Sequence, residues 1–154
     1  HTISVGAASP QDFDRHLKAI ELLPQAVDLI EPVHQRLERA AVDALGPEWM
    51  ATWHVGLPSW QDTPGEINLP VLLWLHNLLE AWDLQSFATA RYRLLGQGGH
   101  WFAGSNADSF DDQVSASALQ AVLGASPWRT RIPMILAELK QRLAGDSQKR
   151  LTSL

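Results

Sequence analysis

Histidines and acids are the side chains of this chain with the chemistry to bind a metal or move protons. Four histidines stand far apart in the sequence: His34, His54, His76 and His100. None of them forms a His-x-x-x-His or His-x-x-His pair, the spacings that put two imidazoles on one helix face. His76 and Glu80 are one turn apart, but a carboxylate-bridged di-iron bundle needs more inward acids than Glu80 and Asp83. The spacing therefore predicts ordinary hydrogen-bonded histidines and no metal site.

Other reactive patterns are weak. The sequence has no Ser/His/Asp set, no phosphate-binding glycine loop and no carboxylate pair with a meaningful spacing. Asp108, Asp111 and Asp112 form a short acidic cluster that we expect at a solvated helix start. Trp101 and Phe102 lie in a glycine-rich loop, where docking and core packing are equally open interpretations.

The composition excludes several classes of protein. The 154 residues are enough for one domain with its own core, and 45% of them are hydrophobic. A net charge of −5 without a basic stripe argues against a nucleic-acid or anionic-membrane partner. The absence of cysteine excludes disulfides and thiolate metal ligands. No apolar run is long enough to span a bilayer and no signal peptide is visible, so we expect a cytoplasmic protein.

The first residues indicate a strand followed by a helix. Thr2–Val5 is a short β-branched run, and the chain offers no convincing second strand to pair with it. Ser9 is a good N-cap, Pro10 suits the first turn and Asp12 stands where a capping acid would. We therefore expect an orphan strand, cut from its sheet, that leads into a helix with Phe13, Leu17, Ile20 and Leu23 on one face.

The rest of the chain predicts helices separated by two long loops, which makes the fold class all-α, an irregular multi-helix bundle. A helix from Pro24 should kink or restart at Pro32 and reach Leu45, with Val33, Leu37, Ala40, Ala41 and Ala44 inward. Gly46-Pro47 should end it, before one short turn over 48–53. Asn68 and Pro70 should begin the most apolar helix, which Asp83 ends. Further helices are predicted over 84–95, 110–123 and 132–144.

Three stretches together resemble the C-terminal region of aldo/keto reductases. Residues 5–17 are similar to the eighth strand, loop and helix of that family's (β/α)8 barrel. Residues 68–70 with 91–107, and then 126–133, resemble a C-terminal extension carried by one branch of the family. The resemblance implies the end of a barrel over 1–23, a helical extension over 24–145 and a flexible tail over 146–154.

In many members of that branch the extension carries two four-iron four-sulfur clusters, whose last cysteine is followed by proline. Thiolates are needed because soft ligands hold such clusters. The matching positions are His54, Leu57, Trp60 and Thr63 in the first set and Ala116, Leu119, Val122 and Ser126 in the second. None of them is a cysteine, so we expect no iron–sulfur cluster, with apolar side chains such as Trp60 filling the volume.

The resemblance also implies a cofactor. In aldo/keto reductases the loop and helix start after the last strand hold the adenosine or 2′-phosphate of NADP or NAD, which places a candidate cofactor site at Gly6, Ser9, Asp12 and His16. At the position of Asp12, a glutamine or arginine would suit a 2′-phosphate better, because the Asp12 carboxylate repels that group. The catalytic residues of the family lie on earlier strands, so this chain should hold none.

The predicted function is therefore that of a non-catalytic helical domain of an NAD(P)H-dependent aldo/keto reductase. Its expected partner is the N-terminal (β/α)8 barrel of the same protein, on which it packs, and it is also a candidate for homodimer formation. The alternative is a stand-alone helical module that binds another protein through an apolar face.

Overall fold

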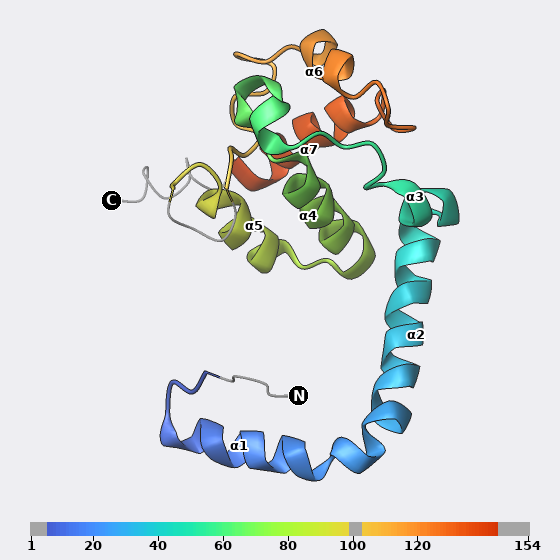
Figure 1. Cartoon of the computed structure of the whole chain (residues 1–154), viewed down its shortest axis with the longest axis vertical. Coiled ribbons are helices and arrows are strands. Elements are labelled where there is room, and N and C mark those ends of the chain that lie inside the picture. The colour runs from blue at the N-terminus through green and yellow to red at the C-terminus, as the bar shows by residue number, and fades with distance from the viewer. Residues whose placement is uncertain (1–5, 99–102, 145–154) are drawn as a thin grey trace. The chain divides into compact units, whose positions relative to one another are not determined.

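A computed structural model describes residues 6–98 and 103–144 of the chain. Within these ranges the fold is all-α and irregular, as the sequence predicts, and no sheet is present. Figure 1 shows α1 (Pro10–Glu21), η1 (Leu23–Gln25), α2 (Ala26–Leu45), α3 (Pro47–Thr52), η2 (Trp60–Asp62), η3 (Pro64–Glu66), α4 (Leu69–Trp82), α5 (Gln85–Leu94), α6 (Ala116–Val122) and α7 (Ile132–Ala144). The predicted strand Thr2–Val5 and the predicted tail lie outside the described residues.

The chain divides into two compact units, one up to Arg39 and the other from Ala40. The break between them falls inside α2. The predicted end of the barrel segment, residue 23, lies in η1, between α1 and α2. None of the helices in the described ranges is long and apolar enough to cross a membrane.

The first unit buries no side chain between residues 6 and 39. Its most regular apolar feature is the α1 stripe, made of Phe13, Leu17 and Ile20, which are 63%, 60% and 59% exposed. Val27 and Ile30 at the start of α2 are 77% and 62% exposed. The helical face that we expected from the spacing is present, and no other residue described in the first unit covers it.

The α2 helix differs from its prediction in two ways. It runs through Pro32 as one helix, so of the predicted kink or restart the restart is wrong. Val33 and Leu37, predicted inward, are exposed, and Ala44 is exposed as well, whereas Ala41 is buried as expected. Apolar spacing identifies a face that can be buried but does not supply the surface that buries it.

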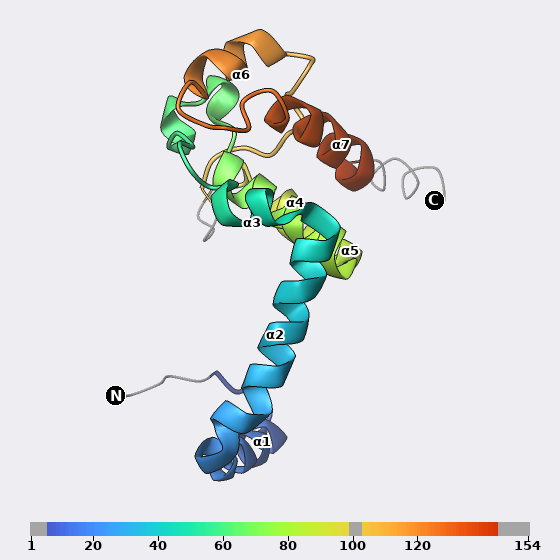
Figure 2. The ribbon, with the colours of Figure 1, turned by 90° about the vertical axis from the view of Figure 1, so that its right-hand side faces the viewer.

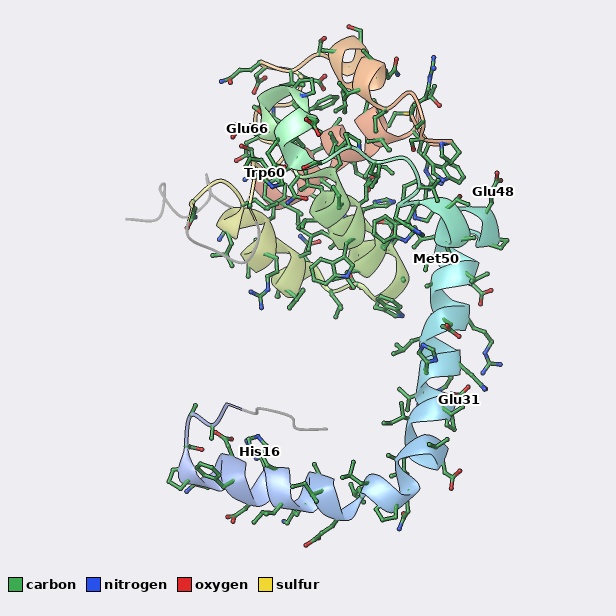
Figure 3. The ribbon with its side chains drawn as sticks, in the orientation of Figure 1. His16, Glu31, Glu48, Met50, Trp60 and Glu66 are labelled. Atoms are coloured by element: carbon green, nitrogen blue, oxygen red, sulfur yellow. The ribbon has the colours of Figure 1, made fainter. Side chains whose placement is uncertain are left out.

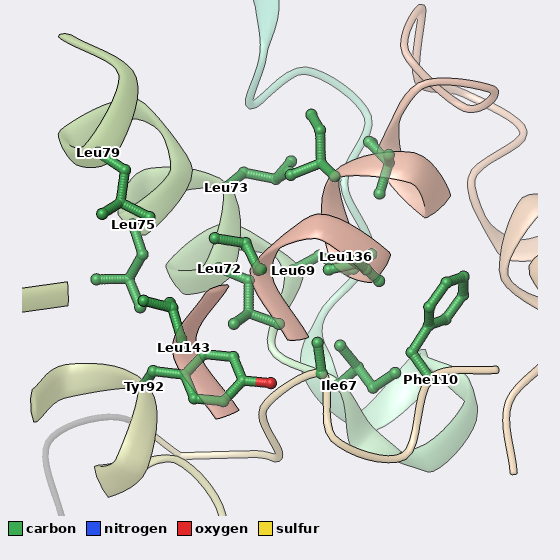
Figure 4. Close-up of a cluster of buried hydrophobic side chains, with 14 of the residues drawn as sticks. Ile67, Leu69, Leu72, Leu73, Leu75, Leu79, Tyr92, Phe110, Leu136 and Leu143 are labelled. Atoms are coloured by element: carbon green, nitrogen blue, oxygen red, sulfur yellow. The ribbon is translucent and has the colours of Figure 1, made fainter. Parts of the chain in front are cut away.

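The second unit is built around α4, with α5 and α7 beside it in both views (Figures 1 and 2). The α4 helix is apolar on nearly every side, and Leu72, Leu73 and Leu75 are fully buried. Leu136 of α7 and Tyr92 of α5 complete the same cluster (Figure 4). This is the central core helix that the sequence predicts.

The ends of α4 follow from two residues. The Asn68 side chain accepts a hydrogen bond from the Val71 amide at 3.1 Å and so caps the helix. Asp83 takes the left-handed conformation that ends it, with φ +51°. Both assignments are confirmed.

The segment before α6 is the least helical part of the second unit. We predicted a helix over 110–123, but α6 begins only at Ala116. Phe110 and Val114 form an isolated bridge, and Asp111 between them has φ +66°, a conformation that no helix continues. The early part of the prediction is therefore wrong, because a local turn competes with the helix.

Candidate functional site

The residues that the resemblance assigns to a nicotinamide cofactor lie at the start of α1, in the first unit. Gly6 is exposed, and no residue in the described ranges lies within 4 Å of a Cβ placed on it. Ser9 and Asp12 are in contact, because the Ser9 hydroxyl donates to the Asp12 carboxylate at 3.0 Å. His16 lies one turn further along α1 (Figure 3), with its ring against Phe13 at 6.4 Å between centroids. The structure thus joins Ser9 to Asp12 and leaves Gly6 and His16 outside that contact.

The Asp12 carboxylate accepts hydrogen bonds from the two residues that precede α1. The amides of Ser9 and Ala8 donate to it at 2.9 and 3.0 Å, and Arg15 donates to its other oxygen at 3.1 Å. These hydrogen bonds, that of the Ser9 amide first, lower the pKa of Asp12, so it is ionised at neutral pH. Pro10 has no N–H to add. A 2′-phosphate at this helix start would face the Asp12 carboxylate, which repels a second anion.

Thr63 and Ser126, each followed by a proline, are buried and hydrogen-bonded. The Thr63 hydroxyl lies 2.7 Å from the carbonyl oxygens of both Trp60 and Ile67. The Ser126 hydroxyl accepts from the Trp128 amide at 3.2 Å. Both hydroxyls therefore have partners within their own turns, and neither requires a metal to be satisfied.

The other six positions that match cluster ligands divide by exposure. Leu119 is in the core, Leu57 and Ala116 pack against it, Trp60 is half-buried, and His54 and Val122 are exposed. Apolar side chains thus dominate the positions, as proposed for a repacked scaffold, while the loss of a cluster itself stays a prediction.

Two glycines, Gly56 and Gly104, allow close backbone contacts between the loops near Thr63 and Ser126. A Cβ on Gly56, which has φ +70°, would lie 2.4 Å from the Ala125 carbonyl oxygen. A Cβ on Gly104, with φ +80°, would lie 2.8 Å from the Glu66 carbonyl oxygen and 3.1 Å from Trp60 (Figure 3 labels both partners). Only glycine fits such contacts. The loop over 54–67 is thereby fixed to two later segments.

The most elaborate side-chain arrangement is the Trp49 cluster, formed by Trp49, His76, Asn77, Trp128 and Arg131. The Trp49 indole N–H donates to the Asn77 amide oxygen at 2.7 Å, and its ring meets the rings of His76 and Trp128 at 5.7 and 5.1 Å. The Arg131 guanidinium lies over the Trp49 ring at 4.4 Å. The cluster joins α3, α4 and the segment before α7.

Sequence reasoning missed this cluster. We assigned Trp49 only to a short helical turn. Helix periodicity says nothing about partners far away in the sequence, such as Asn77, which lies 28 positions after Trp49. The available signal was a tryptophan two residues after the Gly46-Pro47 stop, where a large ring packs back on the core.

The histidines divide between surface and core. His34 is exposed, with its Nε2 at 3.5 Å from Glu38, and His54 is also exposed. His76 is 4% exposed, and neither of its ring nitrogens has a hydrogen-bond partner among the described residues. The prediction of a hydrogen-bonded histidine is therefore wrong for His76, because its neighbours are aromatic rings. His100 lies outside the described residues, and in the described ranges no three His, Asp or Glu side chains gather as metal ligands.

The acidic cluster has structural roles. Asp108 accepts a hydrogen bond of 2.7 Å from the Tyr92 hydroxyl, and burial, followed by this bond, raises the pKa of Tyr92. Asp112 accepts from the Lys140 ammonium at 2.6 Å, which also donates to the Phe110 carbonyl oxygen. These acids tie the 107–114 turn to α5 and α7, whereas Trp101 and Phe102 lie outside the described residues.

No protein-family model, curated protein or solved structure matches this chain.

Proposed function

We propose that this chain is the C-terminal part of a nicotinamide-dependent oxidoreductase of the aldo/keto reductase type, and that its own residues do not perform the chemistry. In this proposal residues up to 23 close a cytoplasmic enzyme's (β/α)8 barrel, and the helices from residue 24 form an extension packed on it. The whole enzyme transfers a hydride from the nicotinamide cofactor to a carbonyl compound.

The observation that carries the proposal is the uncovered α1 stripe. Phe13, Leu17 and Ile20 stand on one face of a capped helix, and all three are more than half exposed. Full burial of a side chain of this size contributes about 1.5–3 kcal/mol. A helix that leaves three such side chains in water is typical of a segment whose covering partner is another surface. The barrel is the partner that the resemblance of residues 5–17 supports.

The gene is the most direct test. DNA upstream of the codon for His1 is expected to continue in frame and encode further strand–helix units, among them a catalytic tyrosine and lysine. A stop codon immediately upstream, with no barrel in frame, contradicts the proposal.

A charged residue in the α1 stripe is expected to destabilise the full-length protein, in which the proposed barrel is present. Ile20→Glu both removes apolar burial and forces a carboxylate into the contact, which should lower the free energy of unfolding by about 3 kcal/mol. Ala19→Glu introduces the same charge on the exposed side of the same helix and should change it by less than about 0.5 kcal/mol. Urea unfolding of the two variants checks this, and equal effects would count against docking through α1.

The capping carboxylate predicts the nicotinamide preference of that enzyme. Asp12→Asn removes a negative charge beside the proposed phosphate position, so the ratio of kcat/KM for NADPH to that for NADH should rise about tenfold. Asp14→Asn removes the same charge from an exposed position on α1 and should leave the ratio unchanged. Steady-state kinetics with both cofactors measure this ratio. An unchanged ratio in Asp12→Asn would show that Asp12 does not lie beside the bound cofactor.

A stand-alone interaction module is the second candidate, and one observation favours it. The unit from Ala40 encloses its own core around Leu72 and Leu136, both fully buried. Such a unit can fold without a barrel. A polypeptide starting at Ala40 that unfolds cooperatively, together with a stop codon upstream of His1, would favour the module.

A further inference from the structure

The buried imidazole of His76 joins two parts of the second unit. It is 4% exposed on α4, and neither nitrogen finds a hydrogen-bond partner among the described residues. Its ring meets Trp49 of α3 at 5.7 Å and an interplanar angle of 80°. The neighbouring Asn77 accepts the Trp49 indole N–H. Two consecutive residues of α4 therefore hold α3 through one tryptophan.

The same tryptophan holds the segment before α7. Trp128 packs edge-on against Trp49 at 5.1 Å, and its own indole N–H donates to the Thr52 hydroxyl of α3 at 3.0 Å. The Arg131 guanidinium lies over both rings, at 4.4 Å from Trp49 and 5.6 Å from Trp128. The position of Trp49 thus decides where α3 and residues 128–131 lie.

A proton on His76 would have no favourable place in this arrangement. The charged groups that act on it are Glu80 on its own helix, Glu138 and Arg142 on α7, and Arg131. Both carboxylates are already ion-paired with Arg142. The Trp49 ring already carries the guanidinium of Arg131, which repels a second cation. Burial is the largest cause and lowers the pKa of His76. Arg131 and Arg142 lower it further, whereas the carboxylates of Glu80 and Glu138 raise it.

We propose that protonation of His76 releases α3 and the Trp128–Arg131 segment from α4, while the packing of α4 against α5 and α7 stays intact. The direction follows from proton linkage. Above the ordinary histidine pKa of about 6.5 both the packed and the released state are neutral, and packing carries no penalty. As the pH falls below that value only the released state binds the proton, so release becomes more favourable.

Amide hydrogen exchange of the full chain, corrected for intrinsic rates, tests the proposal between about pH 7 and about pH 5. If the packed His76 stays neutral throughout this window, the protection of α3 amides should fall about 25-fold between about pH 7 and about pH 5. This is the change in proton binding expected of a released histidine with a pKa of about 6.5. Protection of α7 amides should stay constant. Loss of protection in α7 in parallel with α3 would mean general acid unfolding and would overturn the proposal, as would an α3 protection that does not depend on pH.

Two variants and a control separate His76 from other acid effects. His76→Phe keeps an aromatic ring, His76→Leu avoids the larger volume of phenylalanine, and in both the α3 protection should become independent of pH. His54→Phe is the matched control, because His54 also packs edge-on against a tryptophan, Trp53 at 5.5 Å, but is exposed. It should behave like the wild type. The NMR titration of the His76 ring in the wild type needs no variant, and an ordinary pKa near 6.5 would contradict the proposal.

Discussion

Trp49→Ala is expected to lower the free energy of unfolding of the second unit by about 3–5 kcal/mol, the usual cost of truncating a buried tryptophan. The Trp49 side chain is 1% exposed, and its removal opens a cavity between α3 and α4. It also leaves the buried Asn77 amide oxygen without the indole donor that lies 2.7 Å from it. Urea unfolding followed by circular dichroism measures the loss.

The neighbouring tryptophan provides the control. Trp53 lies one turn further, is half-buried, and packs against the exposed ring of His54. Trp53→Ala should cost clearly less, about 1–2 kcal/mol, because solvent already reaches its ring. Equal losses in the two variants would show that Trp49 has no special place in the fold. Trp49→Phe should recover part of the packing but none of the hydrogen bond.

Gly56→Ala is expected to cost about 2–5 kcal/mol, for two separable reasons. Its φ of +70° is unfavourable for any residue with a Cβ, which accounts for about 1–2 kcal/mol. The added methyl would also lie 2.4 Å from the Ala125 carbonyl oxygen, so one of the two backbones must move. Thermal or urea unfolding of the variant measures the sum.

Gly98→Ala isolates the first of these two costs. Gly98 has φ +64°, close to that of Gly56, but no described residue lies within 4 Å of a Cβ placed on it. The alanine there should cost only the conformational part, about 1–2 kcal/mol. The difference between the two variants is then the free energy of the close approach between the loops. If the variants are equally stable, the contact between Gly56 and Ala125 contributes nothing.

The elements that the sequence predicted well are those whose ends are set by local chemistry. Asn68 and Pro70 begin α4, Asp83 ends it, and Gly46-Pro47 separates α2 from α3, because caps and proline act within one or two turns. The start of α6 was predicted too early, since the left-handed Asp111 closes a turn that helical propensity alone does not reveal.

The parts that could not be predicted depend on contacts between distant segments. The Trp49 cluster brings together residues from three segments, and the fit between Gly56 and Ala125 depends on two loops. Val33 and Leu37 have the spacing of buried residues but are exposed, because spacing identifies a face and not its partner. The candidate cofactor residues were placed by resemblance, and the helix cap that joins Ser9 and Asp12 was predicted from the residues themselves.

The side-chain amide of Asn68 makes two hydrogen bonds, and a carboxylate could make only one of them. Its oxygen accepts the Val71 N–H, while its nitrogen donates to the Ala103 carbonyl oxygen at 2.6 Å. Hydrolysis of this amide, the ageing reaction of asparagine, would leave an aspartate that still caps α4. The same aspartate would turn an oxygen toward the Ala103 carbonyl oxygen, and two acceptors facing each other repel. Slow deamidation would therefore remove one side-chain tie between the start of α4 and the loop that contains Ala103, while the helix cap and the backbone hydrogen bonds of Ser105 with Glu66 and Asn68 remain.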